Sequence, residues 1–310
     1  MDSHQPLAIV FPGQGAQKLG MARDFWEHFL ECRAVFDEAS QAAGYDLTEV
    51  CFEDGARLAL TEFQQPAILT AEIAMLTALR AHRGLVAEYF GGHSLGEYTA
   101  LVAAGVFTLA DAVRIVALRG RLMQEAVPAG NGAMTAIIHA DLDVDWLREI
   151  AAEFAVDVGN YNALDQASLS GLAEDVAAAV AAVKAAPGKR ARSITLRVSA
   201  PFHSRHMKSV EAPLAEALRA IEHVGAAKAV HVLSNRTGAF HTGSRADLER
   251  CLVEQATSTV EWVSCMRELV DRNCRILEVG PGRPLRGFFS SLGVEIESVT
   301  SVATTTELNL

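Results

Sequence analysis

The stretch Leu85-Val-Ala-Glu-Tyr-Phe-Gly-Gly-His-Ser-Leu-Gly96 decides the fold, because it joins an apolar run to a helix through a glycine-rich turn. The run Leu85–Phe90 is typical of a buried strand, and the segment Glu97–Ala104 has a helical pattern. The turn between them matches G-x-S-x-G, in which a sharp strand-to-helix bend leaves the serine hydroxyl exposed. The N–H of Leu95 would then point at an oxyanion forming near the helix N-terminus. A glycine-rich turn with an incidental serine is the alternative, but the flanking elements favour Ser94 as a nucleophile.

Strands and helices alternate on both sides of this turn. Leu7–Phe11 is a short apolar run closed by Pro-Gly-Gln-Gly, as expected of a buried strand that ends in a tight loop. Met21–Ala43 has helical periodicity, and Ala67–Leu79 does so directly after Pro66, a favoured residue for a first helical turn. Apolar strand and helix patterns return near the end of the chain, where Arg275–Val279 is the last predicted strand. The alternation predicts an α/β protein with a mostly parallel sheet.

A different pattern lies between Gly132 and Val198. Its order is strand, helix, strand, strand, helix, strand, which is the ferredoxin-like signature. The assigned elements are Ala133–His139, Val144–Phe154, Ala167–Gly171, Ala173–Ala186 and Ser193–Val198, with one further strand after the first helix. We therefore expect a large subdomain from residues 1–130 and 199–310, with residues 131–198 inserted as a small ferredoxin-like subdomain.

Composition excludes several classes of protein. Of the 310 residues 50% are hydrophobic and 21% are charged, which is a balance of globular rather than disordered chains. The net charge of −11 argues against a general nucleic-acid or anionic-membrane binder. Five scattered cysteines without metal spacing indicate reduced thiols. No signal peptide and no apolar stretch of about 18 residues is present, so we expect a cytoplasmic protein without a membrane span.

A serine nucleophile needs a base, and ten histidines are available. His203 follows a predicted strand and a proline turn, where the functional edge of a sheet is expected, although on its own it would more often be a structural histidine. His93 adjoins the serine inside the turn, where adjacent side chains point apart, so we expect a structural role. His203 and His206 form an HxxH pair without a third ligand, and we expect no metal.

The helical segment Leu109–Val127 contains one misplaced charge. Its apolar face holds Ile115 and Met123, and Arg119 lies within roughly 20° of the centre of that face rather than among the polar residues. A guanidinium turned toward a core is costly unless a carboxylate meets it, and its planar fork suits bidentate carboxylate binding. Two partners remain open at this point: an internal Asp or Glu, or a carboxylate of the substrate.

Together these motifs resemble the malonyl-CoA:acyl carrier protein transacylase family and the acyltransferase domains of polyketide synthases. The matching segments run in order over most of the chain; they are Phe11-Pro-Gly-Gln-Gly-Ala-Gln17, Gln65-Pro-Ala67, Gly92-His-Ser-Leu-Gly-Glu-Tyr98, Arg119-Gly120, Pro201-Phe-His203, Gln255 ahead of Val260-Glu-Trp262, and Glu278-Val-Gly-Pro-Gly282. The resemblance implies a hydrolase-like core with a ferredoxin-like insert. It departs at Ser258-Thr259, where the family usually has a proline, and at Ala163-Leu-Asp-Gln166, where the family commonly has Ser-Pro-x-Gln.

The resemblance also implies a role for each matching residue. Ser94 is similar to the acylated nucleophile and His203 to its base, with the main-chain carbonyl of Gln255 orienting the histidine in place of a triad acid. Gln14 and Leu95 would supply the oxyanion N–H groups. The positions implied to bind the acyl group are Arg119 on the free carboxylate, Gln65, and Phe202, whose bulk would crowd a 2-methyl branch.

The reaction implied by the resemblance is a two-step, ping-pong transfer through a malonyl-serine intermediate. Malonyl-CoA is the substrate, an acyl carrier protein is the partner, its phosphopantetheine thiol is the acceptor, and no bound cofactor is expected. We expect a stand-alone acyltransferase of fatty-acid or polyketide biosynthesis, between which the sequence does not decide. An acyl-thioester hydrolase proofreading carrier proteins needs no carboxylate clamp, so Arg119 counts against that alternative. Ser94 and His203 count against a catalytically silent carrier-binding module.

The longest basic stretch lies in the predicted small subdomain. It consists of Lys184, Lys189, Arg190, Arg192 and Arg197, with no acidic residue between them. Because carrier proteins are typically acidic and this chain is acidic as well, docking would need a local positive patch. We hypothesise that Lys189, Arg190 and Arg192 bind the partner; a merely solvated face is the alternative.

Overall fold

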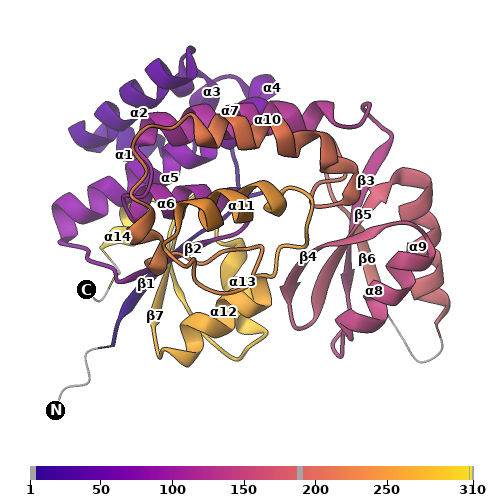
Figure 1. Ribbon diagram of the computed structural model, residues 1–310. Helices are drawn as coiled ribbons and strands as arrows, with labels where there is room; N and C mark the ends of the chain where they lie inside the picture. Colours follow the sequence, from indigo (N-terminus) through magenta and orange to yellow (C-terminus); the bar gives the residue numbers. More distant parts are fainter. Residues whose placement is uncertain (1–4, 187–190, 307, 309–310) are drawn as a thin grey trace.

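The computed structural model describes residues 5–186, 191–306 and 308. Within this range the larger subdomain is built on a parallel sheet in the order β2-β1-β7-β8, seen edge-on behind the helices in Figure 1. Its strands are β1 (Leu7–Phe11), β2 (Tyr89–Gly92), β7 (Arg275–Val279) and β8 (Glu297–Val299). The expected strands at residues 7–11 and 275–279 are confirmed, whereas β2 begins four residues later than expected.

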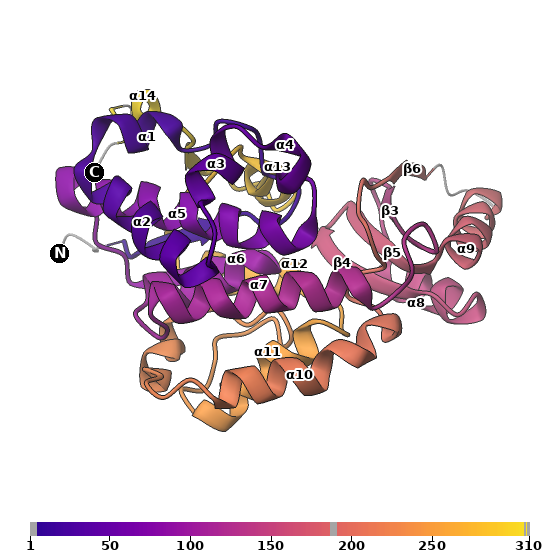
Figure 2. The same cartoon turned by 90° about the horizontal axis from the view of Figure 1, so that it is seen from above.

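Helices pack around this parallel sheet. Figure 2 shows α5 and α7 lying side by side, with α10 along the flank of α7 and α11 packed against α10. The helices of the large subdomain are α1 (Arg23–His28), α2 (Leu30–Ala43), α3 (Leu47–Phe52), α4 (Gly55–Leu58), α5 (Thr61–Arg83), α6 (Leu95–Ala103), α7 (Leu109–Glu125), α10 (Lys208–Arg219), α11 (Arg245–Gln255), α12 (Trp262–Asp271), α13 (Pro284–Ser290) and α14 (Val302–Thr305), with 3-10 turns η1 (Arg205–Met207) and η2 (Ala226–His231).

Two helices differ from the pattern expected from periodicity. The segment Met21–Ala43, expected as one helix, is divided between α1 and α2, because the backbone of Phe29 is extended (φ −124°, ψ 123°). The Phe29 N–H donates to the Phe25 carbonyl and so caps the C-terminus of α1. The second helix begins at Thr61, five residues before Pro66, so this proline lies inside α5 rather than in its first turn. Tertiary contacts hold that extra turn: the Thr61 N–H donates to the Gln124 side chain, and the Gln64 amide donates to the Leu58 carbonyl.

The small subdomain lies beside the large one, to the right in Figures 1 and 2. Its elements are β3 (Gly132–Ile138), α8 (Val144–Glu153), β4 (Asp157–Ala163), β5 (Gln166–Leu172), α9 (Ala173–Ala185) and β6 (Arg192–Thr195). The strands form an antiparallel sheet in the order β4-β5-β3-β6, and α8 and α9 pack on its apolar side. This is the ferredoxin-like order expected from the sequence, so the predicted fold class is confirmed.

Helix α6 crosses the central strands at a very short distance, next to the turn that carries Ser94. A Cβ on Gly92 would lie 2.1 Å from the Gly96 backbone, and one on Gly96 would lie 2.2 Å from the Phe11 carbonyl oxygen. Only glycine at these two positions lets the strand and the helix approach so closely. No helix in the described part of the chain is long and apolar enough to cross a membrane.

Candidate active site

Ser94 occupies a strained turn between β2 and α6. Its backbone has φ 52° and ψ −100°, a conformation that residues other than glycine rarely adopt. The Asn235 side chain holds this turn from both sides, since its oxygen accepts from the Ser94 N–H and its amide donates to the Gly92 carbonyl at 2.8 Å. Leu95 is the first residue of α6, so its N–H belongs to the first turn, where helix N–H groups have no partner within the helix.

His203 lies directly against the serine. The Ser94 Oγ is 2.7 Å from His203 Nε2, and His203 Nδ1 is 2.8 Å from the main-chain oxygen of Gln255. A carbonyl only accepts, so Nδ1 carries the proton and Nε2 is left to accept the serine proton. The segment after β6 and the C-terminal end of α11 thus bring a nucleophile, a base and an orienting carbonyl together, which is the arrangement needed for covalent catalysis.

The electrostatic surroundings keep His203 neutral. Burial, and next the nearby Arg119 cation, lower the pKa of His203 to about 3, although the hydrogen bond to Gln255 acts in the opposite direction. Burial also lowers the pKa of His93 to about 4, while Nε2 of His93 bonds the Asn162 side chain at 2.8 Å. Both rings are therefore neutral at ordinary pH, and His203 is ready to accept a proton.

Arg119 is the largest charged side chain in the core and is only 1% exposed. From α7 it donates to Gln65 Oε1 and Gln255 Oε1, each at 2.8 Å, and to Ser94 Oγ at 3.1 Å. All three acceptors are uncharged, and no carboxylate of the described residues forms an ion pair with it. Its buried Nε has no hydrogen-bond partner in the same part of the chain. Of the two partners left open by the sequence, the described residues supply no Asp or Glu in an ion pair with Arg119.

The Gln255 side chain ties the arginine to the serine turn. Its Oε1 accepts from Arg119, its Nε2 donates to the Ser94 carbonyl at 3.0 Å, and its own carbonyl holds His203. Sequence reasoning singled out only the carbonyl. The side-chain role and the role of Asn235 were missed, because both depend on tertiary contacts with residues more than 130 positions away.

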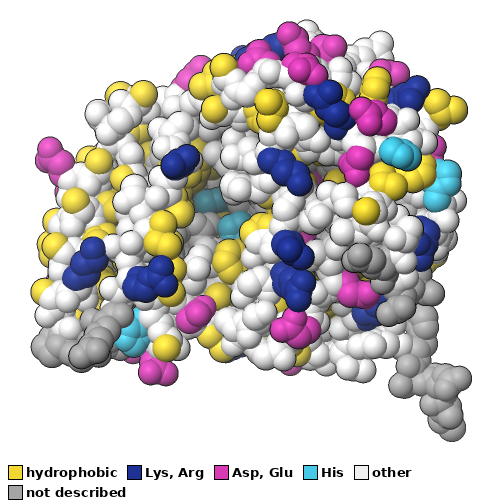
Figure 3. All heavy atoms as spheres, turned by 180° about the vertical axis from the view of Figure 1, so that it is seen from behind, with side chains coloured by type: hydrophobic (Ala, Val, Ile, Leu, Met, Phe, Trp, Pro, Cys, Tyr) yellow, Lys and Arg dark blue, Asp and Glu magenta, His cyan; other side chains and the backbone are white. Residues whose placement is uncertain are grey.

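A cavity of about 230 Å³ opens onto Ser94, His203 and Arg119. Its walls combine polar side chains with an apolar face from both subdomains, formed by Met123, Met134, Leu196, Val198, Phe202 and Phe288; the polar lining includes Gln14, Gln65, Asn160, Asn162 and Gln166. Figure 3 shows a hollow near the middle of this face, with histidine at its floor and Lys and Arg side chains around it. The size and mixed lining of the cavity suit a narrow, partly apolar ligand whose reacting end reaches Ser94.

Comparison with known proteins places the chain in a family. Residues 8–275 match the acyl transferase domain family. The chain belongs to the acyltransferases. The malonyl CoA-acyl carrier protein transacylase of Escherichia coli K12 is 41% identical over 285 residues, 91% of each chain, and the transacylase of Bacillus subtilis is 37% identical over 300 residues, 94% of this chain and 92% of its own.

Solved structures agree with this family. The malonyl CoA-acyl carrier protein transacylase of Coxiella burnetii superposes with a TM-score of 0.91 at 33% identity, covering 98% of this chain and 96% of its own. A malonyl-transacylase in complex with a type II polyketide synthase acyl carrier protein superposes with a TM-score of 0.89 at 35% identity, covering 97% and 98%. The predicted family and the predicted acyltransferase activity are confirmed.

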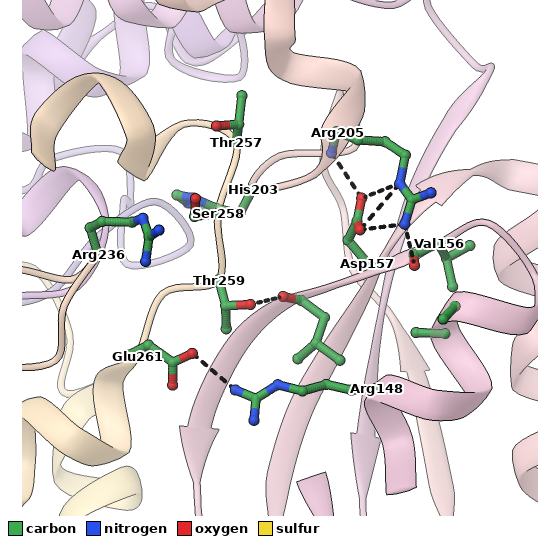
Figure 4. A pocket seen from close by; sticks show the side chains of 13 residues that line it. Arg148, Val156, Asp157, His203, Arg205, Arg236, Thr257, Ser258, Thr259 and Glu261 are labelled. Atoms are coloured by element: carbon green, nitrogen blue, oxygen red, sulfur yellow. Dashed lines mark hydrogen bonds and ion pairs between the residues drawn. The ribbon is translucent and has the colours of Figure 1, made fainter. Parts of the chain in front are cut away.

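A second hollow of the acyltransferase, of about 340 Å³, lies on the other side of His203. Figure 4 shows it between β4 and the segment after α11, with Ser258 and Thr259 along one wall. Thr259, which stands where the family usually has a proline, donates to the Val158 carbonyl at 2.6 Å and so joins the two subdomains. This departure therefore faces the second hollow, whereas Gln166, from the other departure, lines the acyl cavity.

The residues expected to bind the partner are only partly described. Lys189 and Arg190 lie outside the described residues. Arg192 is exposed at the start of β6, and Arg197 is exposed between two residues that line the cavity, Leu196 and Val198. In the part of the chain that the structure describes, no cluster of three or more His, Cys, Asp or Glu side chains that could hold a metal ion occurs.

Proposed function

We propose that this acyltransferase moves a malonyl group from malonyl-CoA to the phosphopantetheine thiol of an acyl carrier protein through a malonyl-Ser94 ester. The observation that carries the proposal is the buried Arg119 fork, 3.1 Å from the Ser94 hydroxyl and, within the part of the chain that the structure describes, in no ion pair with a carboxylate. A buried cation is stabilised when an anion binds beside it, and a malonyl group esterified to Ser94 brings its free carboxylate to the Arg119 guanidinium. The relatives named for malonyl transfer support the same substrate.

The first half-reaction forms the ester. Ser94 Oγ attacks the thioester carbonyl carbon while His203 Nε2 takes the hydroxyl proton, and the main-chain N–H groups of Gln14 and Leu95 stabilise the oxyanion. Collapse of the tetrahedral intermediate breaks the carbon–sulfur bond, and the proton on His203 passes to the departing CoA sulfur. Arg119, aided by Gln65, holds the distal carboxylate throughout, so that the acyl carbon stays beside the nucleophile.

The second half-reaction repeats these steps in reverse. The phosphopantetheine thiol gives its proton to His203 and attacks the ester carbon, and the Ser94 oxygen leaves and recovers the proton. Since the same groups serve both directions, the protein needs no resident cofactor, and ping-pong kinetics follow. We infer that the reaction serves fatty-acid or polyketide synthesis in the cytoplasm.

An acyl-thioester hydrolase is the second candidate, and intact-protein mass spectrometry separates the two. After mixing with malonyl-CoA, a malonyl adduct on Ser94 that is discharged by holo-carrier protein supports transfer. Rapid release of free malonate supports hydrolysis, and absence of both an adduct and free malonate contradicts both candidates. Ser94→Ala, which lacks the nucleophile, is the matched control.

We infer that the carrier protein docks on the basic segment of the small subdomain, with Arg192 and the adjoining Lys189 and Arg190. An acidic partner needs such a positive region on a chain of net charge −11. Charge reversal at Lys189 and Arg190 should raise the KM for the carrier protein and leave acylation by malonyl-CoA unchanged. An unchanged carrier-protein KM would contradict this docking surface.

A further inference from the structure

Glu97 is a fully buried carboxylate that the transfer reaction, as described above, does not use. It lies in the first turn of α6, three residues after the nucleophile. Its Oε2 accepts from the Gln255 Nε2 at 2.7 Å and from the Asn235 N–H at 2.9 Å, and its Oε1 accepts from His241 Nε2 at 2.9 Å. One carboxylate therefore bonds both residues that hold Ser94 in place.

These contacts determine which way the Gln255 amide faces. An amide can place either its oxygen or its NH2 group on a given side. With the NH2 on Glu97 and on the Ser94 carbonyl, the oxygen faces Arg119, and every contact pairs a donor with an acceptor. The reversed amide would set its NH2 against the Arg119 guanidinium and its oxygen against a carboxylate, so that each contact would be repulsive.

We propose that Glu97 is a positioning residue for dicarboxylate selection: it fixes the Gln255 amide and, through it, the Arg119 guanidinium beside Ser94. The inference rests on the proposed malonyl transfer. It assigns to Glu97 no contact with the substrate. Its effect is carried by two hydrogen bonds in series: Arg119 donates to Gln255 Oε1, and Gln255 Nε2 donates to Glu97.

His241 makes this arrangement compatible with the chemistry. A lone carboxylate one turn from Ser94 would oppose the negative charge that develops on the acyl oxygen. His241 contacts Glu97 from the opposite side and is itself buried. Burial alone disfavours a charged ring, but the Cys251 thiol and the Glu97 carboxylate raise the pKa of His241 to about 9. A protonated His241 places a positive charge directly beside the Glu97 carboxylate.

The test is a double-mutant cycle on selectivity. Acylation of Ser94 by malonyl-CoA and by acetyl-CoA is followed by rapid-quench mass spectrometry in the wild type, Glu97→Gln, Gln255→Leu and the double variant. Gln255→Leu keeps the main-chain carbonyl that holds His203 and removes only the amide. We expect each single variant to lower the malonyl-over-acetyl ratio about tenfold, the effect of one hydrogen bond, and the double variant to lower it no further.

The controls separate positioning from a merely structural role. Glu72→Gln removes another fully buried carboxyl group, on α5, which bonds Thr99 and not the site, and should leave the ratio unchanged. Glu97→Asp, which keeps the charge beside His241 but is one methylene shorter, gives the same readout should Glu97→Gln not fold. An unchanged ratio in a folded Glu97 variant, or effects of Glu97 and Gln255 that multiply, would overturn the inference. A wild type that takes no malonyl group would instead overturn the proposed function.

Discussion

Replacing Arg119 by alanine removes the group that selects a dicarboxylic acyl chain. The arginine lies 3.1 Å from the Ser94 hydroxyl and offers a planar fork that is almost fully buried. A hydrogen bond to a charged group contributes about 1.5–3 kcal/mol, so a two-bond contact with the malonyl carboxylate is worth at least about 3 kcal/mol. At about 1.4 kcal/mol per factor of ten, kcat/KM for malonyl-CoA should fall about a hundredfold or more.

Acetyl-CoA gives the opposite expectation, because an acetyl group leaves the buried cation unpaired in the wild type. Acetylation of Arg119→Ala should be unchanged or faster, and the malonyl preference should be lost. Single-turnover acylation of Ser94, measured by rapid quench and intact-protein mass spectrometry below the unfolding temperature, gives both rates. Arg119→Lys keeps the charge without the fork and should retain a reduced preference. A malonyl-over-acetyl ratio within about threefold of wild type in folded Arg119→Ala would refute the clamp.

Three further predictions use other contacts of the site. Phe202→Ala should raise the methylmalonyl-over-malonyl ratio about tenfold in competition assays, since space for one methyl group is worth about 1–3 kcal/mol; an unchanged ratio would remove Phe202 from specificity. In Arg119→Ala the pKa of His203 should rise above about 3, because one cause of its depression is gone, and the acid limb of the acetyl-CoA rate profile should move to higher pH. The pKa of His241 is raised from 6.5 to about 9, so its protonation stabilises the fold in full below pH 6.5, and this stabilisation is lost as the pH rises through 9. His241→Gln should therefore flatten the pH dependence of the thermal unfolding temperature between these pH values. A curve that keeps its wild-type slope would argue against a charged His241.

The sequence predicted those parts of the site that follow from local pattern. Ser94 was predictable because its glycines and flanking elements form one continuous motif, and Arg119 because a charge on the apolar face of a helix violates the helical period. The family resemblance supplied the Gln255 carbonyl. Glu97, by contrast, occupies an ordinary acidic position in the first turn of a helix, and only the fold brings Asn235 and His241 to it, from positions 138 and 144 residues away.

The fold divides in the same way. The strands Leu7–Phe11 and Arg275–Val279 are short apolar runs, and their predicted bounds agree with those of β1 and β7. The break at Phe29 carries no glycine or proline signal, and the early start of α5 depends on the side chains of Gln64 and Gln124. Gln65 lies in this additional part of the helix and accepts from Arg119 at 2.8 Å; the resemblance implied a role for Gln65, but the expected helix start gave no sign of this hydrogen bond.

A crystal structure of the protein acylated with malonyl-CoA tests the carboxylate clamp most directly. The account predicts density for a malonyl ester on Ser94, with carboxylate oxygens about 2.7–2.9 Å from the guanidinium nitrogens of Arg119. A malonyl carboxylate directed toward solvent, with Arg119 still bonded only to Gln65, Gln255 and the serine oxygen, would contradict it.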